Sequence, residues 1–136
     1  DKSITPQNFL RLSKKDGYSL MCQKGSGLEK IDGVEIPDYA FVIEKPQFDS
    51  FAYISLLKML REKDIKTLVI TGVRTEICID ATAKRAFAEG FDTIILRDLV
   101  GTYDDRQKIQ DFVLELFNKY SGYVFTSNEF IKMFEK

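Results

Sequence analysis

The chain is 136 residues long and has a formal net charge of -1, with 44% hydrophobic and 30% charged residues. This composition is typical of one soluble globular domain, and we treat residues 1–136 as a single domain. The balanced charge excludes a general nucleic-acid binder, and no apolar run is long enough to cross a membrane, so we expect a cytoplasmic protein.

Helices alternate with buried strands along most of the chain. Residues 1–38 are rich in turn sequences and show at most a short helix. Strands are predicted from short apolar runs, at 39–43, 66–71, 92–96 and 122–126. Helices are predicted where apolar residues recur at steps of three and four, over 51–63, 76–89 and 104–120, with a last helix that begins at Thr126. The alternation indicates an α/β fold: a doubly wound, Rossmann-like parallel sheet with helices on both faces.

The sequence contains no histidine, which removes every Ser-His, Cys-His and His-metal site that this chain could build alone. A hydrolase of this composition needs a carboxylate, a lysine or a tyrosine as its acid or base. We expect no metal and no cofactor. Two cysteines are too few for a disulfide scaffold and fit a reducing compartment. Of these, Cys22 lies in turn-rich sequence and is interpreted as structural or incidental.

Reactive side chains follow the ends of the predicted strands, where this kind of sheet places its ligands. Lys45 follows the first strand, Cys78 the second and Asp98 the third. With Thr75 as the predicted N-cap, Cys78 falls in the first turn of a helix, whose free amides favour a thiolate and can hold an oxyanion. The alternative stays open that Cys78 only packs and that Lys45 is only a solvated charge.

Several segments in the same order resemble one superfamily. The strongest covers residues 68–91 and includes Thr75-x-x-Cys78; the others are 42–51 around Lys45, 94–98 and 22–26. They resemble the isochorismatase-like cysteine hydrolases, which include nicotinamidases, N-carbamoylsarcosine amidases and ureidoacrylate amidases. The resemblance implies hydrolysis of a C–N bond in a small amide-type substrate, and a homo-oligomer.

The resemblance also implies the roles of individual residues. Cys78 is the expected nucleophile, and Lys45 is expected to come close enough to its sulfur to stabilise the thiolate. The backbone amides of Arg74 and Cys78 form the expected oxyanion hole, beside a cis peptide bond between Val73 and Arg74. A thioester on Cys78 is then hydrolysed by water. The side chain of Arg74 either meets a substrate carboxylate or points to solvent or a subunit boundary.

One part of the family pattern has no counterpart in the sequence. The third catalytic residue of the family is an aspartate on its first strand, in an Asp-x-Gln pattern, and the first two family strands are not found. We therefore expect the chain to lack an N-terminal segment, which is either cut away or present as a companion fragment. Two alternatives remain: an inactive family member that serves as a binding or assembly module, and an unrelated doubly wound domain that binds a nucleotide or small anion.

Overall fold

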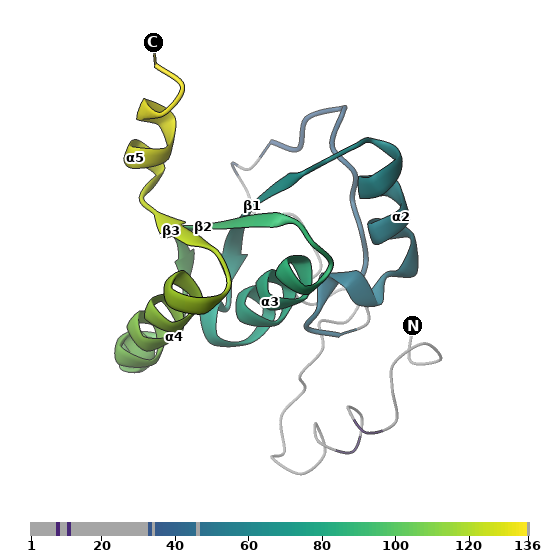
Figure 1. Cartoon of the computed structure of the whole chain (residues 1–136). Helices are drawn as coiled ribbons and strands as arrows, with labels where there is room; N and C mark the ends of the chain where they lie inside the picture. The colour runs from purple at the N-terminus through teal and green to yellow at the C-terminus, as the bar shows by residue number, and fades with distance from the viewer. Residues whose placement is uncertain (1–7, 9–10, 12–32, 34, 46, 136) are drawn as a thin grey trace. The chain divides into compact units, whose positions relative to one another are not determined.

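The computed structural model describes residues 8, 11, 33, 35–45 and 47–135. The chain forms two compact units, residues 1–47 and residues 48–136. The sheet and the helices that cover it belong to the second unit (Figure 1).

Within the described residues, the sheet has three parallel strands in the order β1-β2-β3. These strands are β1 (Thr67–Val73), β2 (Asp92–Gly101) and β3 (Tyr123–Phe125). The helical elements before, between and after the strands are η1 (Ser50–Ala52), α2 (Ile54–Glu62), η2 (Thr75–Ile79), α3 (Asp80–Ala88), η3 (Asp104–Arg106), α4 (Gln107–Tyr120) and α5 (Ser127–Lys132). The α/β fold predicted from the alternating pattern is confirmed, with each helix overlapping or adjoining its predicted range.

The strand predicted at 39–43 is wrong. These residues are neither helical nor paired in a ladder, and the Tyr39, Phe41 and Val42 side chains are 85%, 64% and 75% exposed. A strand is stabilised by its ladder hydrogen bonds and by burial of its side chains. An apolar segment forms a strand only where a second strand is available for pairing. The apolar composition of residues 39–43 was therefore not sufficient to predict a strand.

Strand β2 extends beyond its predicted end at residue 96. Its pairing with β1 shifts register between Ile70 and Gly72: Ile70 lies opposite Ile95, whereas Gly72 lies opposite Val100. The extra residues of β2 leave the ladder as a bulge, a device that re-aims side chains at strand ends. Polar residues can occupy such a bulge, so apolar content did not reveal that the strand continues.

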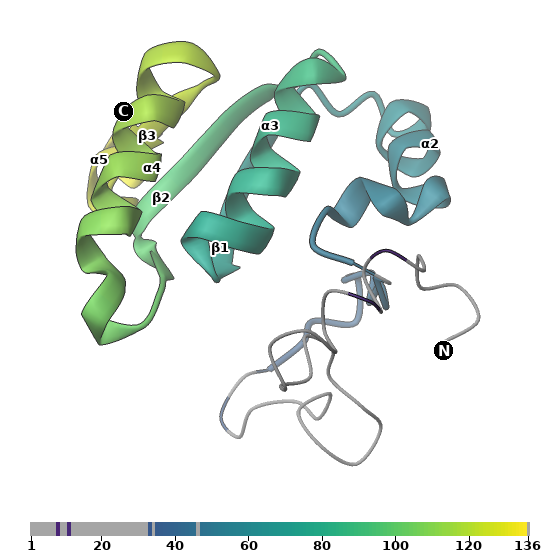
Figure 2. The same ribbon diagram turned by 90° about the horizontal axis from the view of Figure 1, so that it is seen from below.

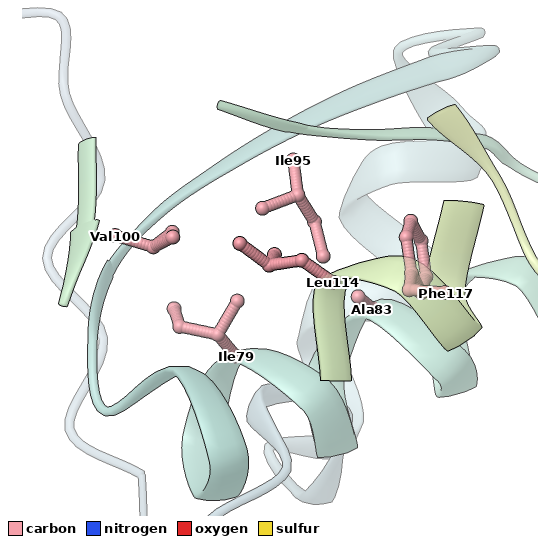
Figure 3. Close-up of a cluster of buried hydrophobic side chains, with 6 residues drawn as sticks. All are labelled: Ile79, Ala83, Ile95, Val100, Leu114 and Phe117. Atoms are coloured by element: carbon pink, nitrogen blue, oxygen red, sulfur yellow. The ribbon is translucent and has the colours of Figure 1, made fainter. Parts of the chain in front are cut away.

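Helices α3 and α4 pack side by side on one face of the sheet (Figure 2). Their buried side chains meet Ile95 and Val100 of β2, and burial of each large one contributes about 1.5–3 kcal/mol. Helix α5 contacts β2 on the side of the sheet away from these helices (Figures 1 and 2). The six residues of the main cluster, drawn in Figure 3, are Ile79, Ala83, Ile95, Val100, Leu114 and Phe117.

A second apolar cluster joins α2 to the same sheet. Phe51 and Phe91 are buried with Ala86, and the two phenylalanine rings lie 6.1 Å apart. Leucines of α2 pack against this group, and so do Leu68 and Ile70 of β1. Through this shared cluster, α2 is held on the sheet, whose strand β1 leads to Cys78.

Gly122 is required because it lies in close contact with both α4 and β2. A Cβ at this position would lie 2.3 Å from the Thr93 carbonyl oxygen and 2.7 Å from the Phe117 ring. We expect Gly122→Ala to lower the free energy of unfolding by about 1–3 kcal/mol, measured by urea denaturation. Gly101→Ala is the matched control, because its Cβ would meet only Val73 at an ordinary 3.5 Å. Equal stability of the two variants would contradict this packing argument.

Candidate active site

Cys78 lies in the first helical turn after β1. Strand β1 ends at Val73, the peptide bond between Val73 and Arg74 is cis, and the π-helical turn η2 begins at Thr75 and continues into α3. Gly72 has a φ of +114°, a conformation that favours glycine, so the chain can turn sharply before the helix starts. The thiol of Cys78 is free and partly buried.

The backbone of this turn carries the amides that the resemblance assigned to an oxyanion hole. The Arg74 carbonyl oxygen accepts hydrogen bonds from the amides of Ile77, at 3.1 Å, and Ile79, at 3.2 Å. The amide of Cys78 lies between these two in the chain. Single π-helical turns of this kind are frequent at functional sites, because they alter which amides the helix uses internally.

Thr75 does not act as the predicted N-cap. Arg74 occupies the cap position of η2 and makes no side-chain cap, whereas Thr75 is fully buried. The Thr75 hydroxyl lies 2.8 Å from Oε1 of Gln110 and 3.1 Å from the carbonyl oxygen of Gly101, and it can donate to either. These contacts connect the turn that carries Cys78 to α4 and to the end of β2. Thr75 therefore stabilises the turn through tertiary hydrogen bonds and not as a helix cap.

Gln110 was not identified from the sequence. Its signal is a polar residue four positions before the buried Leu114 and seven before the buried Phe117, on the apolar face of α4. A polar side chain on such a face needs a hydrogen-bond partner. The partner is Thr75, which lies 35 residues away in the chain, and local periodicity could not reveal it.

The guanidinium of Arg74 is held by a carboxylate of the same turn. Its Nε and Nη2 donate to Oε1 of Glu76 at 3.0 and 2.7 Å. The guanidinium also lies 4.4 Å from the centre of the Tyr103 ring, and Nη1 of Arg106 is 3.8 Å from the same Glu76 oxygen. In this structure the partner of the Arg74 guanidinium is therefore a carboxylate of its own turn.

Glu76 is stabilised as an anion in this cluster. Burial raises the pKa of its carboxyl group, but hydrogen bonds from its own amide and from Arg74 help to outweigh burial and lower that pKa below the ordinary value. The hydrogen bond to Glu76 in turn raises the pKa of Arg74. Both side chains are therefore charged at neutral pH.

Lys45 belongs to the first unit, and Cys78 to the second. The Lys45 ammonium group donates to the carbonyl oxygen of Gln47 at 2.8 Å. Its close approach to the Cys78 sulfur stays a prediction. Cys22, interpreted as structural or incidental, lies outside the described residues.

Asp98 supports α5. Its Oδ1 accepts a hydrogen bond from the Ser127 amide at 2.7 Å, and its Oδ2 accepts one from the Ser127 hydroxyl. These hydrogen bonds lower the pKa of Asp98. Thr126 and Glu129 form a capping box at the start of α5, next to the position at which the last helix was predicted to begin. Asp98 thus uses the bulge of β2 to fix the start of the last helix.

Two further findings concern only the part of the chain that the structure describes. No group of three or more cysteine, aspartate and glutamate side chains in it could hold a metal ion. No helix in it has both the length and the apolar character that crossing a membrane requires.

Comparisons with known proteins agree with the resemblance. The model of the isochorismatase domain matches residues 4–129. The chain is 32% identical over 79 residues, 58% of its length, to the ureidoacrylate amidohydrolase RutB of Acinetobacter baylyi, of which it covers 32%. It is 28% identical to the nicotinamidase PncA of Bacillus subtilis, with a TM-score of 0.58 over 61% of this chain and 45% of that one.

A third comparison shows the fold over nearly the whole chain. An isochorismatase-like hydrolase from Alkaliphilus metalliredigens is 22% identical and superimposes with a TM-score of 0.77, over 96% of this chain and 69% of that one. The chain spans less than two thirds of both RutB and PncA. The hypothesis of an unrelated nucleotide-binding domain is therefore wrong: with 126 consecutive residues matched by the family model, the chain belongs to the isochorismatase family.

Proposed function

We propose that the protein hydrolyses the C–N bond of a small amide through a thioester on Cys78. The observation that carries this proposal is the position of a free thiol in a π-helical turn directly after the first strand of the sheet. Relatives named as an amidohydrolase and a nicotinamidase support the choice of an amide substrate. The isochorismatase family is a family of hydrolases. The thioester intermediate on Cys78 is the part of the mechanism that we propose in addition.

In the proposed reaction the Cys78 thiolate adds to the carbonyl carbon of the amide. The resulting oxyanion accepts hydrogen bonds from the backbone amides of Arg74 and Cys78. The C–N bond then breaks, the nitrogen takes a proton and leaves as the amine, and a thioester remains on Cys78. Water adds to the thioester and releases the carboxylic acid and the thiol. Lys45 is the proposed second member of the site, where its positive charge favours the thiolate.

The leaving nitrogen needs an acid that donates a proton. The edge of the sheet at β1 is where we expect this acid to be supplied. Among them, β1 pairs only with β2, and its other edge has no strand beside it. Asp49 is the first described carboxylate that follows Lys45 in the sequence. Its Oδ1 already accepts a hydrogen bond from the Phe51 amide at 2.8 Å. We propose that a further strand, from a segment or companion outside the described residues, covers the β1 edge and brings the acid.

Trapping of the thioester tests the proposal. The protein is incubated with a panel of small primary amides and ureido compounds, quenched in acid and digested. We expect the peptide that contains Cys78 to gain the mass of the acyl group, and hydroxylamine to release that group as a hydroxamate. Release of amine without any adduct on Cys78, at every quench time, would contradict the mechanism. Binding of an amide with no release of acid would favour the alternative of an inactive binding module.

A further inference from the structure

The segment just before α2 follows the helix that continues from the Cys78 turn. Phe51 is buried in one cluster with Ala86 of α3. One turn earlier on the same helix, the hydroxyl oxygen of Thr82 accepts a hydrogen bond from the amide of Ser50 at 3.1 Å. The contacts of this segment thus move toward its beginning as they move toward the beginning of the helix, where Cys78 lies.

Thr82 fixes this segment at more than one point. Its hydroxyl group also lies 3.3 Å from Oγ of Ser50 and 3.4 Å from the carbonyl oxygen of Phe48, and it can donate its one hydrogen to either. The conformation of the segment is held as well, because Asp49 accepts a hydrogen bond from the Phe51 amide at 2.8 Å. Thr82 is half-buried, so these hydrogen bonds are partly shielded from water.

Thr82 follows Cys78 by one helical turn. The helix does not break between them, because Ile79 (φ -69°, ψ -51°) and Asp80 (φ -59°, ψ -47°) both have helical backbone angles. Four residues of helix rise about 6 Å along the axis, so the anchor at Thr82 lies about that far along the helix from the thiol. Cys78 and Thr82 are both half-buried.

The covalent chain limits how far Lys45 can lie from this anchor. Lys45 precedes Phe48 by three residues (48 − 45), and three residues span at most about 11 Å of extended chain. The lysine side chain adds a flexible four-carbon stem. An ammonium group has three hydrogens, so its hydrogen bond to the Gln47 carbonyl oxygen is compatible with a further contact. The length of chain therefore allows the ammonium group to reach Cys78 from the anchor.

We propose, on the basis of the function proposed above, that Thr82 is a positioning residue for Lys45. By holding Phe48 and Ser50 against the helix of Cys78, its hydroxyl group keeps the lysine charge within range of the thiolate. A charge that is held in place acts on the thiolate more strongly than one that is spread over the surrounding solvent. Thr82 acts through the lysine and not on the substrate.

The rate of Cys78 alkylation by iodoacetamide tests the proposal without any turnover, because only the thiolate reacts. The rate is followed at neutral pH on the peptide that contains Cys78. Thr82→Val keeps the branched shape of the side chain, removes its hydroxyl group and should lower the rate about two- to threefold. A unit charge about 6 Å away has an effect of about threefold in largely aqueous surroundings. Thr82→Ser keeps the hydroxyl group and should retain the wild-type rate.

A second background separates positioning from a general effect on the fold. In Lys45→Met, the further change Thr82→Val should leave the alkylation rate unchanged, because no charge remains to be positioned. Thr93→Val is the matched control, since it removes a buried hydroxyl group that donates to the Phe91 carbonyl oxygen at 3.1 Å. The same fall in both backgrounds, or an equal fall in Thr93→Val, would overturn the proposal.

Thr82→Ala covers the case in which Thr82→Val does not fold, as judged by circular dichroism, because alanine has the highest helix propensity. It should show the same fall, again only when Lys45 is present. A fall in Lys45→Met without one in the folded Thr82 variants would overturn this proposal and leave the proposed function intact. Failure of the wild-type protein to hydrolyse any amide would count against the proposed function alone, because alkylation does not depend on turnover.

Discussion

Replacing Cys78 with serine is expected to lower the rate of amide hydrolysis by at least about 10³-fold, because the variant loses an easily ionised nucleophile. A serine hydroxyl needs a strong base beside it, and the chain contains no histidine that could serve. The amides of the π-helical turn would still be present, so binding of the substrate should change much less than kcat. Steady-state kinetics on an amide identified in the trapping experiment measure both quantities.

The controls for this variant use the other thiol and the fold. Cys22→Ser should retain turnover within about twofold, in keeping with a structural or incidental role. Circular dichroism and urea unfolding should show that Cys78→Ser keeps the native fold, since the change in volume at a partly buried site is small. Undiminished hydrolysis by a folded Cys78→Ser protein would show that another residue is the nucleophile.

The fold could be predicted to a large extent because its elements carry strong local patterns. The apolar runs at β1, β2 and β3 and the helical spacing of α3 and α4 are properties of short windows. The failures arose where structure depends on distant residues. The segment 39–43 has the composition of a strand without a ladder partner among the described residues, and β2 continues through a bulge that only its pairing with β1 reveals.

The candidate site could likewise be predicted from the sequence only in part. The position of Cys78 after a strand, in a first helical turn, follows from the order of residues along the chain. The ties that hold this turn do not: Thr75 meets Gln110 and Gly101 across 35 and 26 residues, and Tyr103 lies 29 positions after Arg74 (103 − 74). Side chains at such separations are brought together by packing of α4 and β2 against the sheet, which no local pattern encodes.

These hydrogen bonds hold the backbone of the turn in place and pair the charge of Arg74 with that of Glu76. Thr75 fixes the backbone that carries the two amides proposed to hold the oxyanion, and Glu76 fixes the side chain of Arg74. A preorganised set of amides stabilises an oxyanion without the cost of reorganisation at the moment of reaction. The chain thus holds the proposed nucleophile in a five-residue turn whose backbone and preceding arginine are both fixed by hydrogen bonds.

Lys45→Met is expected to lower kcat/KM for the amide by about 10²–10³-fold, because the site loses the positive charge that favours the thiolate and holds the acid in place. Methionine keeps much of the length and apolar volume of the lysine side chain, so the change isolates the ammonium group. Lys45→Arg keeps the charge but spreads it over a planar group, and we expect it to retain part of the activity.

Lys58→Met is the matched control for Lys45→Met. Lys58 lies on α2, is 76% exposed and pairs with Glu62 at 3.7 Å, so its loss should change turnover by less than about twofold. The rate of Cys78 alkylation by iodoacetamide gives a second readout, which should fall in Lys45→Met and not in Lys58→Met. If the two variants instead hydrolyse the amide and react with iodoacetamide equally well, Lys45 is a solvated charge at the surface, and the positive charge beside Cys78 must come from another part of the protein.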